Sequence, residues 1–249
     1  MVVSIIIMNE FESKFKARLK KVSQELNSIE DFLRENGIDI PNQNITLESD
    51  EKIWIPRGYI RTVQYYEHKY RLHDLLGDEI LAKNIAYALQ ASDFFNYMLN
   101  RFRIELSVGK VFFKYAIINI FSVVESLLYG IINKCHSHCS LDDRVCKNNV
   151  GCDFYFKKAN KYSFKNLLQI LSQKGLVRMP DEIQDKLLEL KALRDNIHLW
   201  DVKDKDYFND NYNLTNYNFL VRVLQVLKED LNDSLEVFEY NRNNNCNKC

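Results

Sequence analysis

The stretch ELKALRDNIHLWD, Glu189–Asp201, places an arginine and a histidine inside an apolar helical pattern. Arg194 and His198 are four residues apart, and side chains at that spacing lie on one face of an α-helix. A guanidinium group binds phosphate oxygens bidentately, and an imidazole exchanges protons near neutral pH. The pair therefore suits attack of a ribose 2′-hydroxyl on its own phosphodiester. His198 would move the proton, Arg194 would stabilise charge on phosphorus, and no metal or other cofactor would be needed.

Taken alone, the pair is more typical of an ordinary role at the protein surface or at a helix end, because an arginine and a histidine meet at this spacing by chance in many helices. Glu125 bears on the choice. It interrupts the apolar segment Val111–Ile132, and an unpaired buried carboxylate is costly. We expect Glu125 either to pair with Arg194 and orient its guanidinium, or to face solvent or pair elsewhere.

The remaining elements are predicted to be helices, because glycine (7) and proline (3) are scarce in 249 residues. Val111–Ile132 contains Lys114 and Asn119 besides Glu125, and charge is costly inside a bilayer. The segment is therefore interpreted as a buried central helix rather than a membrane span.

Helix-start and helix-stop residues frame the segment that carries Arg194. Ser163 is predicted to cap one helix and Gly175 to end it. Pro180 and Asp181 then open the next helix, and a further helix closes the chain.

This arrangement resembles the HEPN superfamily, especially its Abi-like and RNase-toxin branches. The resemblance runs from Phe112 to about Val237, roughly half of the chain. It rests on the apolar helix around Glu125, on an apolar helix followed by a break and a helix ending in arginine, a polar residue and histidine, and on the closing helix. The helix order carries more of the resemblance than the short motif.

The resemblance implies an up-and-down helical bundle that dimerises with two motifs facing each other across a cleft. It implies metal-independent RNA cleavage in active members, and binding or dimerisation in members without catalysis. The family motif maps onto Arg194, Asp195 and His198, with Asn196 and Glu125 as orienting residues. The usual motif separates arginine and histidine by more residues, and the shorter form resembles Abi-like members.

These features predict a metal-independent endoribonuclease in bacterial defence or a toxin–antitoxin system. Its expected partners are an RNA substrate, a second copy of the chain, and an antitoxin or other protein, in the cytosol and without a membrane. The alternative is a non-catalytic dimerisation or interaction module. Lys plus Arg and Asp plus Glu both number 34, which argues against a general polyanion binder.

The N-terminal region, residues 1–106, is expected to hold helices that extend the bundle of residues 107–240 or form a small accessory domain. A helix is predicted at Glu10–Asn36, ended by Gly37, with apolar residues near the 3.5-residue repeat of a coiled coil. That seam suits either packing within one chain or a dimer contact. Residues 37–58 are interpreted as a linker, with a short strand possible at KIWI.

Two shorter segments of this region also carry predictions. Asp78 is expected to cap a helix, and Leu106–Lys110 to form a turn before the central helix. Tyr65–His73 mixes aromatic and basic residues. That mixture suits RNA contacts, but an ordinary amphipathic helix is favoured.

Residues 133–162 are interpreted as a cysteine-rich insertion, and residues 241–249 as a disordered tail. The insertion holds Cys135, Cys139, Cys146 and Cys152 with two histidines. Four thiols and two imidazoles suit tetrahedral zinc, but their spacing matches no standard zinc finger. Zinc binding, redox chemistry and a plain loop with unligated cysteines remain open, and the plain loop is favoured.

Overall fold

The computed structural model describes residues 2–37, 53, 55, 58–140, 156–195 and 210–246. Within these residues the regular elements are all helices, so the predicted all-α class is confirmed. The chain divides into two compact units, Met1–Pro56 and Arg57–Cys249.

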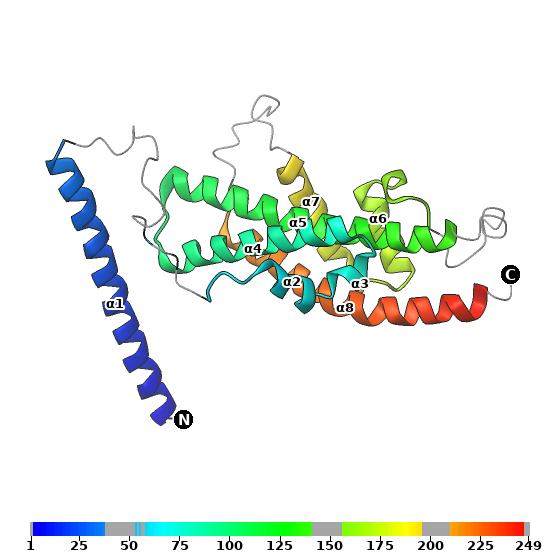
Figure 1. The fold of residues 1–249 in the computed structure, drawn as a ribbon, viewed down its shortest axis with the longest axis horizontal. Helices are drawn as coiled ribbons and strands as arrows, with labels where there is room; N and C mark the ends of the chain where they lie inside the picture. Colours follow the sequence, from blue (N-terminus) through cyan, green and yellow to red (C-terminus); the bar gives the residue numbers. More distant parts are fainter. Residues whose placement is uncertain are drawn as a thin grey trace. The chain divides into compact units, whose positions relative to one another are not determined.

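The first unit contains one helix, α1, at Val2–Glu35 (Figure 1). The helix predicted at Glu10–Asn36 is confirmed, and it begins earlier because no glycine or proline precedes it. Gly37 follows its end with a φ of 73°, a left-handed conformation that glycine adopts at helix ends. Most of the predicted linker at 37–58, and the possible KIWI strand within it, lies outside the described residues.

The second unit is built on two long helices, α4 (Glu79–Arg101) and α5 (Leu106–Ser140). They run in opposite directions, as two contacts show: Asn119 donates a hydrogen bond to the carbonyl of Ala88, and farther along α4 Phe95 packs against Phe112, which lies earlier in α5. The predicted cap at the start of α4 is confirmed: a carboxylate oxygen of Asp78 accepts a 2.9 Å hydrogen bond from the backbone N–H of Leu81.

The turn predicted at Leu106–Lys110 is wrong, because these residues form the start of α5. Gly109 serves close packing instead. A Cβ at this position would lie 2.8 Å from the carbonyl oxygen of Ile104, which only glycine avoids. Gly130, farther along α5, packs against side chains instead: a Cβ there would lie 2.6 Å from a terminal methyl of Leu76 in α3 (Leu72–Leu76), which a leucine side chain can move to relieve.

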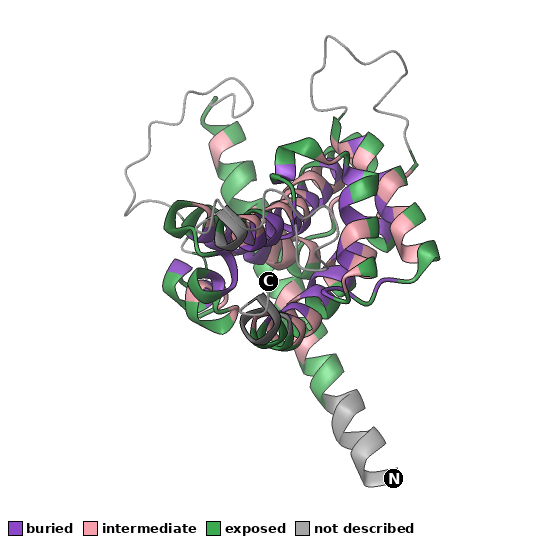
Figure 2. Cartoon of the chain, turned by 90° about the vertical axis from the view of Figure 1, so that its right-hand side faces the viewer, coloured by how far each residue is buried: buried purple, intermediate pink, exposed green. Residues whose placement is uncertain are grey.

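Helix α5 forms the centre of the core. Helices α4, α7 (Asp181–Asp195) and α8 (Leu214–Cys246) pack around it, and their buried positions gather on the inward faces of the unit (Figure 2). This burial supplies the main favourable free energy of folding. The most deeply buried α5 residues include Ala116, Ile117, Phe121, Val124, Leu128, Ile131 and Ile132.

The helix boundaries predicted around α7 are confirmed. Ser163 caps α6 (Phe164–Gln173) by accepting a 3.2 Å hydrogen bond from the backbone N–H of Asn166. Gly175 follows α6 with a φ of 69°, and α7 starts directly after Pro180. The short 3-10 helix η4 (Ala159–Lys161) precedes α6.

The closing helix α8 continues to Cys246, past residue 240, where the sequence predicted the bundle to end and a disordered tail to begin. No glycine or proline follows Pro180 in the chain, so no backbone signal stops the helix. Residues 247–249 lie outside the described part of the chain.

The segment Tyr65–His73 is helical and amphipathic, as favoured, but it forms two short helices rather than one, because Arg71 takes a left-handed φ of 48° between them. It spans α2 (Val63–Lys69) and the start of α3, with Tyr66 and Leu72 buried and Tyr65 exposed. Helices α2, α3 and α4 share a compact unit with α5 to α8, so the division between units falls at Pro56–Arg57 rather than after residue 106.

One described helix segment, Leu106–Ser137, is long and apolar enough to cross a membrane, and 67% of its most apolar window is buried inside the protein. Two of its polar residues are also accommodated inside the protein. Lys114 is buried, and Asn119 donates hydrogen bonds to the carbonyl of Ala88 and the hydroxyl of Ser92. These features match the predicted core helix.

Candidate active site at the end of α7

Arg194 lies in the last turn of α7 and forms an ion pair with Glu125 from the middle of α5. Its Nη2 atom is 2.7 Å from Oε2 of Glu125. The Glu125 side chain is 13% exposed and that of Arg194 is 33% exposed. The first alternative for Glu125, pairing with Arg194, is thus what the structure contains.

The packing of α7 on α5 explains why these two side chains meet. Leu187, Leu190 and Leu193 are buried and hold α7 against α5. Arg194 follows Leu193 directly, so its side chain leaves the helix at the edge of the buried face. Glu125 occupies the equivalent edge of α5, where it follows the buried Val124 and precedes the partly exposed Ser126.

Asp195 completes the cluster as a second carboxylate on Arg194. Its Oδ1 is 3.1 Å from Nη1 of Arg194, and its Oδ2 is 2.5 Å from Nζ of Lys191. Burial raises the pKa of Asp195, but hydrogen bonds from Lys191 and Arg194 outweigh burial and hold the pKa below its ordinary value. Asp195 is therefore ionised at neutral pH, and the four charges of Lys191, Arg194, Glu125 and Asp195 balance.

Tyr129 lies one helical turn beyond Glu125 on the same face of α5. Burial raises the pKa of its hydroxyl, and the negative charge of Glu125 raises it further, while Lys191 and Arg194 act in the opposite direction. The hydroxyl consequently stays protonated at neutral pH. Tyr129 and Lys191 were not among the predicted site residues, although their spacing of four from Glu125 and Asp195 was a visible signal.

Of the five predicted site residues, Arg194, Asp195 and Glu125 are brought together. Asn196 and His198 lie outside the described residues. The next described part of the chain, which begins at residue 210, contacts the end of α7. The hydroxyl of the buried Tyr212 donates a 3.4 Å hydrogen bond to the carbonyl of Leu193. This contact caps the end of α7 beside Arg194.

The predicted cysteine-rich insertion begins inside α5, since the helix continues to Ser140. Cys135 is buried in the core, and Nδ1 of His136 donates a 2.8 Å hydrogen bond to the carbonyl of Phe156. Among the described residues, no three His, Cys, Asp or Glu side chains group as metal ligands. Cys146 and Cys152 lie outside that part of the chain, so the predicted alternatives for the four cysteines are not resolved by these contacts.

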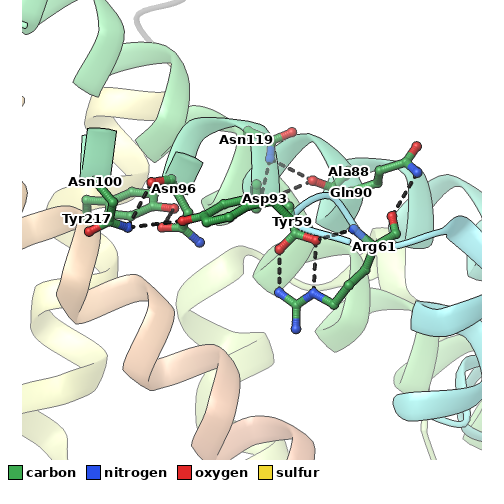
Figure 3. Close-up of polar contacts among 10 residues, drawn as sticks. Tyr59, Arg61, Ala88, Gln90, Asp93, Asn96, Asn100, Asn119 and Tyr217 are labelled. Carbon is green, nitrogen blue, oxygen red and sulfur yellow. Dashed lines mark hydrogen bonds and ion pairs between the residues drawn. The ribbon is translucent and has the colours of Figure 1, made fainter. Parts of the chain in front are cut away.

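A second arginine–carboxylate pair joins the start of this unit to α4 (Figure 3). Asp93 accepts hydrogen bonds from the backbone N–H and Nε of Arg61, both 2.9 Å, and also pairs with its Nη2. Burial raises the pKa of Asp93, but the bonds from Arg61 and Tyr66 outweigh it and lower the pKa. No sequence pattern marks this pair, whose partners are 32 residues apart.

Neighbouring polar residues extend this second cluster toward α8. The hydroxyl of Tyr217 donates a 2.9 Å hydrogen bond to the side-chain oxygen of Asn96, and the Gln90 amide donates to the carbonyl of Arg61. Burial, with a smaller contribution from the charge of Asp93, raises the pKa of Tyr217 to about 12. These bonds join the segment before α2, α4 and α8 around the Arg61–Asp93 pair.

No protein-family model matches this sequence, and neither a curated protein nor a solved structure is significantly similar to it.

Proposed function

We propose that the protein is a metal-independent endoribonuclease of HEPN type, acting in the cytosol in bacterial defence or a toxin–antitoxin system. The observation that carries the proposal is the ion pair between Arg194 and Glu125. It fixes the guanidinium at the end of α7, four residues before His198, while leaving a third of the arginine side chain exposed. A fixed, partly exposed guanidinium is a suitable phosphate ligand.

In this proposal His198 takes the proton of the ribose 2′-hydroxyl as it attacks phosphorus, and a proton is returned to the leaving 5′-oxygen. Arg194 stabilises the negative charge that grows on the phosphate oxygens. Glu125 and Asp195 orient Arg194 from two sides, and Asn196 supports the histidine. The products are a 2′,3′-cyclic phosphate and a free 5′-hydroxyl.

Cleavage of total RNA by the purified full chain in EDTA tests this proposal. Wild type is expected to leave 2′,3′-cyclic phosphate ends, and His198→Ala and Arg194→Ala are expected to be at least about a hundredfold slower. His68→Ala and Arg222→Ala alter an exposed histidine and an exposed arginine elsewhere and serve as matched controls. Full activity in His198→Ala would reject the proposed mechanism.

A non-catalytic interaction module is the second candidate, and one observation favours it. Both terminal nitrogens of Arg194 already contact carboxylates, and the surrounding cluster carries no net charge. Such a cluster attracts phosphate weakly. In this case wild type and His198→Ala would both leave RNA intact, while the folded chain would still bind a second copy or an antitoxin-like protein.

A further inference from the structure

Helix α1 presents an apolar seam that nothing in the described part of its unit covers. No side chain of residues 11–35 is buried, and the coloured part of this helix visible near the N label in Figure 2 is exposed or intermediate. Val22 is 54% exposed and Ile29 is 47% exposed. The complete seam consists of Phe15, Leu19, Val22, Leu26, Ile29 and Leu33.

The seam has the spacing of a coiled coil, because its steps alternate between four and three residues. Leu19, Leu26 and Leu33 then occupy the first core position of the heptad, called a, and Phe15, Val22 and Ile29 the second, called d. A single amphipathic helix in water is held mainly by packing of its apolar face. A helix with this repeat is expected to place that face against another helix.

The charges beside the seam determine which orientation is favourable. Basic residues gather at 14–21 and acidic residues at 25–35. Arg18 and Glu25 occupy the flanking heptad position called g, and Glu30 the flanking position called e. In a parallel pair Glu25 would face Glu30 of the second copy, which is repulsive. In an antiparallel pair Arg18 faces Glu25 of the second copy, and the same attractive contact forms twice.

We propose that α1 binds α1 of a second copy of this chain as an antiparallel coiled coil. Leu19 packs against Val22 of the second copy, and Leu26 packs against its Phe15. Phe11, which is 69% exposed, then lies opposite Phe32 of the second copy, which is 63% exposed. This register buries the central part of the seam, Phe15, Leu19, Val22 and Leu26, and places Arg18 against Glu25 at the same time. It is independent of the proposed nuclease function.

Sedimentation equilibrium of the full chain tests the interface through its apolar seam. Wild type is expected to dimerise, and Leu26→Glu to raise the dimer Kd by at least about a hundredfold, because it places a charge in the buried seam. Ser28→Glu introduces the same charge on the opposite face of α1 and is expected to change Kd by less than about threefold. Monomeric wild type at about 100 μM, or equal effects of the two variants, would overturn the proposal.

Charge reversal tests the orientation, because it is expected to raise the dimer Kd of an antiparallel pair and to lower that of a parallel pair. Glu25→Lys places a lysine against Arg18 of the second copy in the antiparallel pair, so Kd is expected to rise about tenfold. The double variant Arg18→Glu, Glu25→Lys restores opposite charges and is expected to return Kd near the wild-type value. A parallel pair would instead be tightened by Glu25→Lys, because the lysine would face Glu30. Tightening or no change would overturn the antiparallel arrangement.

Discussion

Two arginine–carboxylate pairs in the second unit use the same chemistry in opposite ways. Arg61 and Asp93 form a closed pair: the carboxylate is 4% exposed and takes three hydrogen bonds from one arginine. Arg194 and Glu125 form an open pair: the arginine is shared between two carboxylates, Glu125 at 13% exposure and Asp195 at 47%, whereas Arg61, itself 45% exposed, serves Asp93.

This difference separates a structural contact from a candidate site. The closed pair joins the segment before α2 to α4, and Arg61 also lies over the rings of Tyr65 and Tyr66. Asp93 accepts three hydrogen bonds from Arg61 and one from Tyr66, so little acceptor capacity remains for a ligand. The open pair lies at the last turn of α7, four residues before His198 in the sequence, and its arginine is divided between two carboxylates, of which Asp195 is about half exposed.

The largest predicted effect is loss of stability in Arg61→Ala. Removal of the arginine leaves the nearly inaccessible Asp93 carboxylate without its main partner, so the free energy of unfolding is expected to fall by about 3 kcal/mol. Urea denaturation measures this change. Arg71→Ala is the matched control, because Arg71 pairs with the exposed carboxylates of Asp74 and Glu236, and its expected loss is below about 1 kcal/mol. Equal losses would remove the distinction of the closed pair.

The pH dependence of this loss provides a sharper test. In wild type the pKa of Asp93 lies below its ordinary value of 3.8. Its stabilising contribution is therefore present above about pH 4 and is lost as pH falls through the folded-state pKa. In Arg61→Ala, burial is expected to raise the pKa of Asp93, because its arginine partner is gone. Ionisation of this carboxyl group then destabilises the fold as pH rises. The stability difference between wild type and variant should narrow by about 1 kcal/mol between pH 6 and pH 3. A constant difference would contradict this account.

The open pair is predicted to contribute less to stability. Glu125→Ala should lower the free energy of unfolding by about 1 kcal/mol, because Arg194 is partly exposed and regains water. A double-mutant cycle with Arg194→Ala measures the coupling between the two side chains. We expect this coupling to be smaller than that between Arg61 and Asp93. In the proposed nuclease, Glu125→Gln should also slow RNA cleavage about tenfold while the protein stays folded. Equal coupling energies would remove the contrast.

The smallest effect is expected at Asp195. Asp195→Asn weakens two partly exposed contacts and should cost about 0.5 kcal/mol, less at high salt. The pKa of Asp195 lies below its ordinary value of 3.8, so this contribution is present above about pH 4 and disappears as pH falls further. Thermal unfolding at low and high salt measures the difference. A loss as large as that of Arg61→Ala would mean that the open cluster is as structural as the closed one.

The sequence by itself determined the helical class and most helix ends. Asp78, Ser163 and Pro180 are local signals, and each acts through its own backbone neighbours. The apolar character of α5 likewise predicted a buried helix, because burial depends on composition along one element. Gly109 misled the prediction, since glycine is favoured both in turns and where backbones approach closely.

The tertiary structure alone decided which distant side chains meet. Glu125 was predicted either to pair with Arg194 or to face solvent or another partner. The packing of α7 on α5 brings Arg194 to Glu125, so the ion pair forms. No local pattern connected Arg61 with Asp93, because their contact depends on how the chain before α2 crosses α4. Helix formation follows from interactions a few residues apart, whereas an ion pair between helices depends on their relative placement, which the packing of the whole core determines.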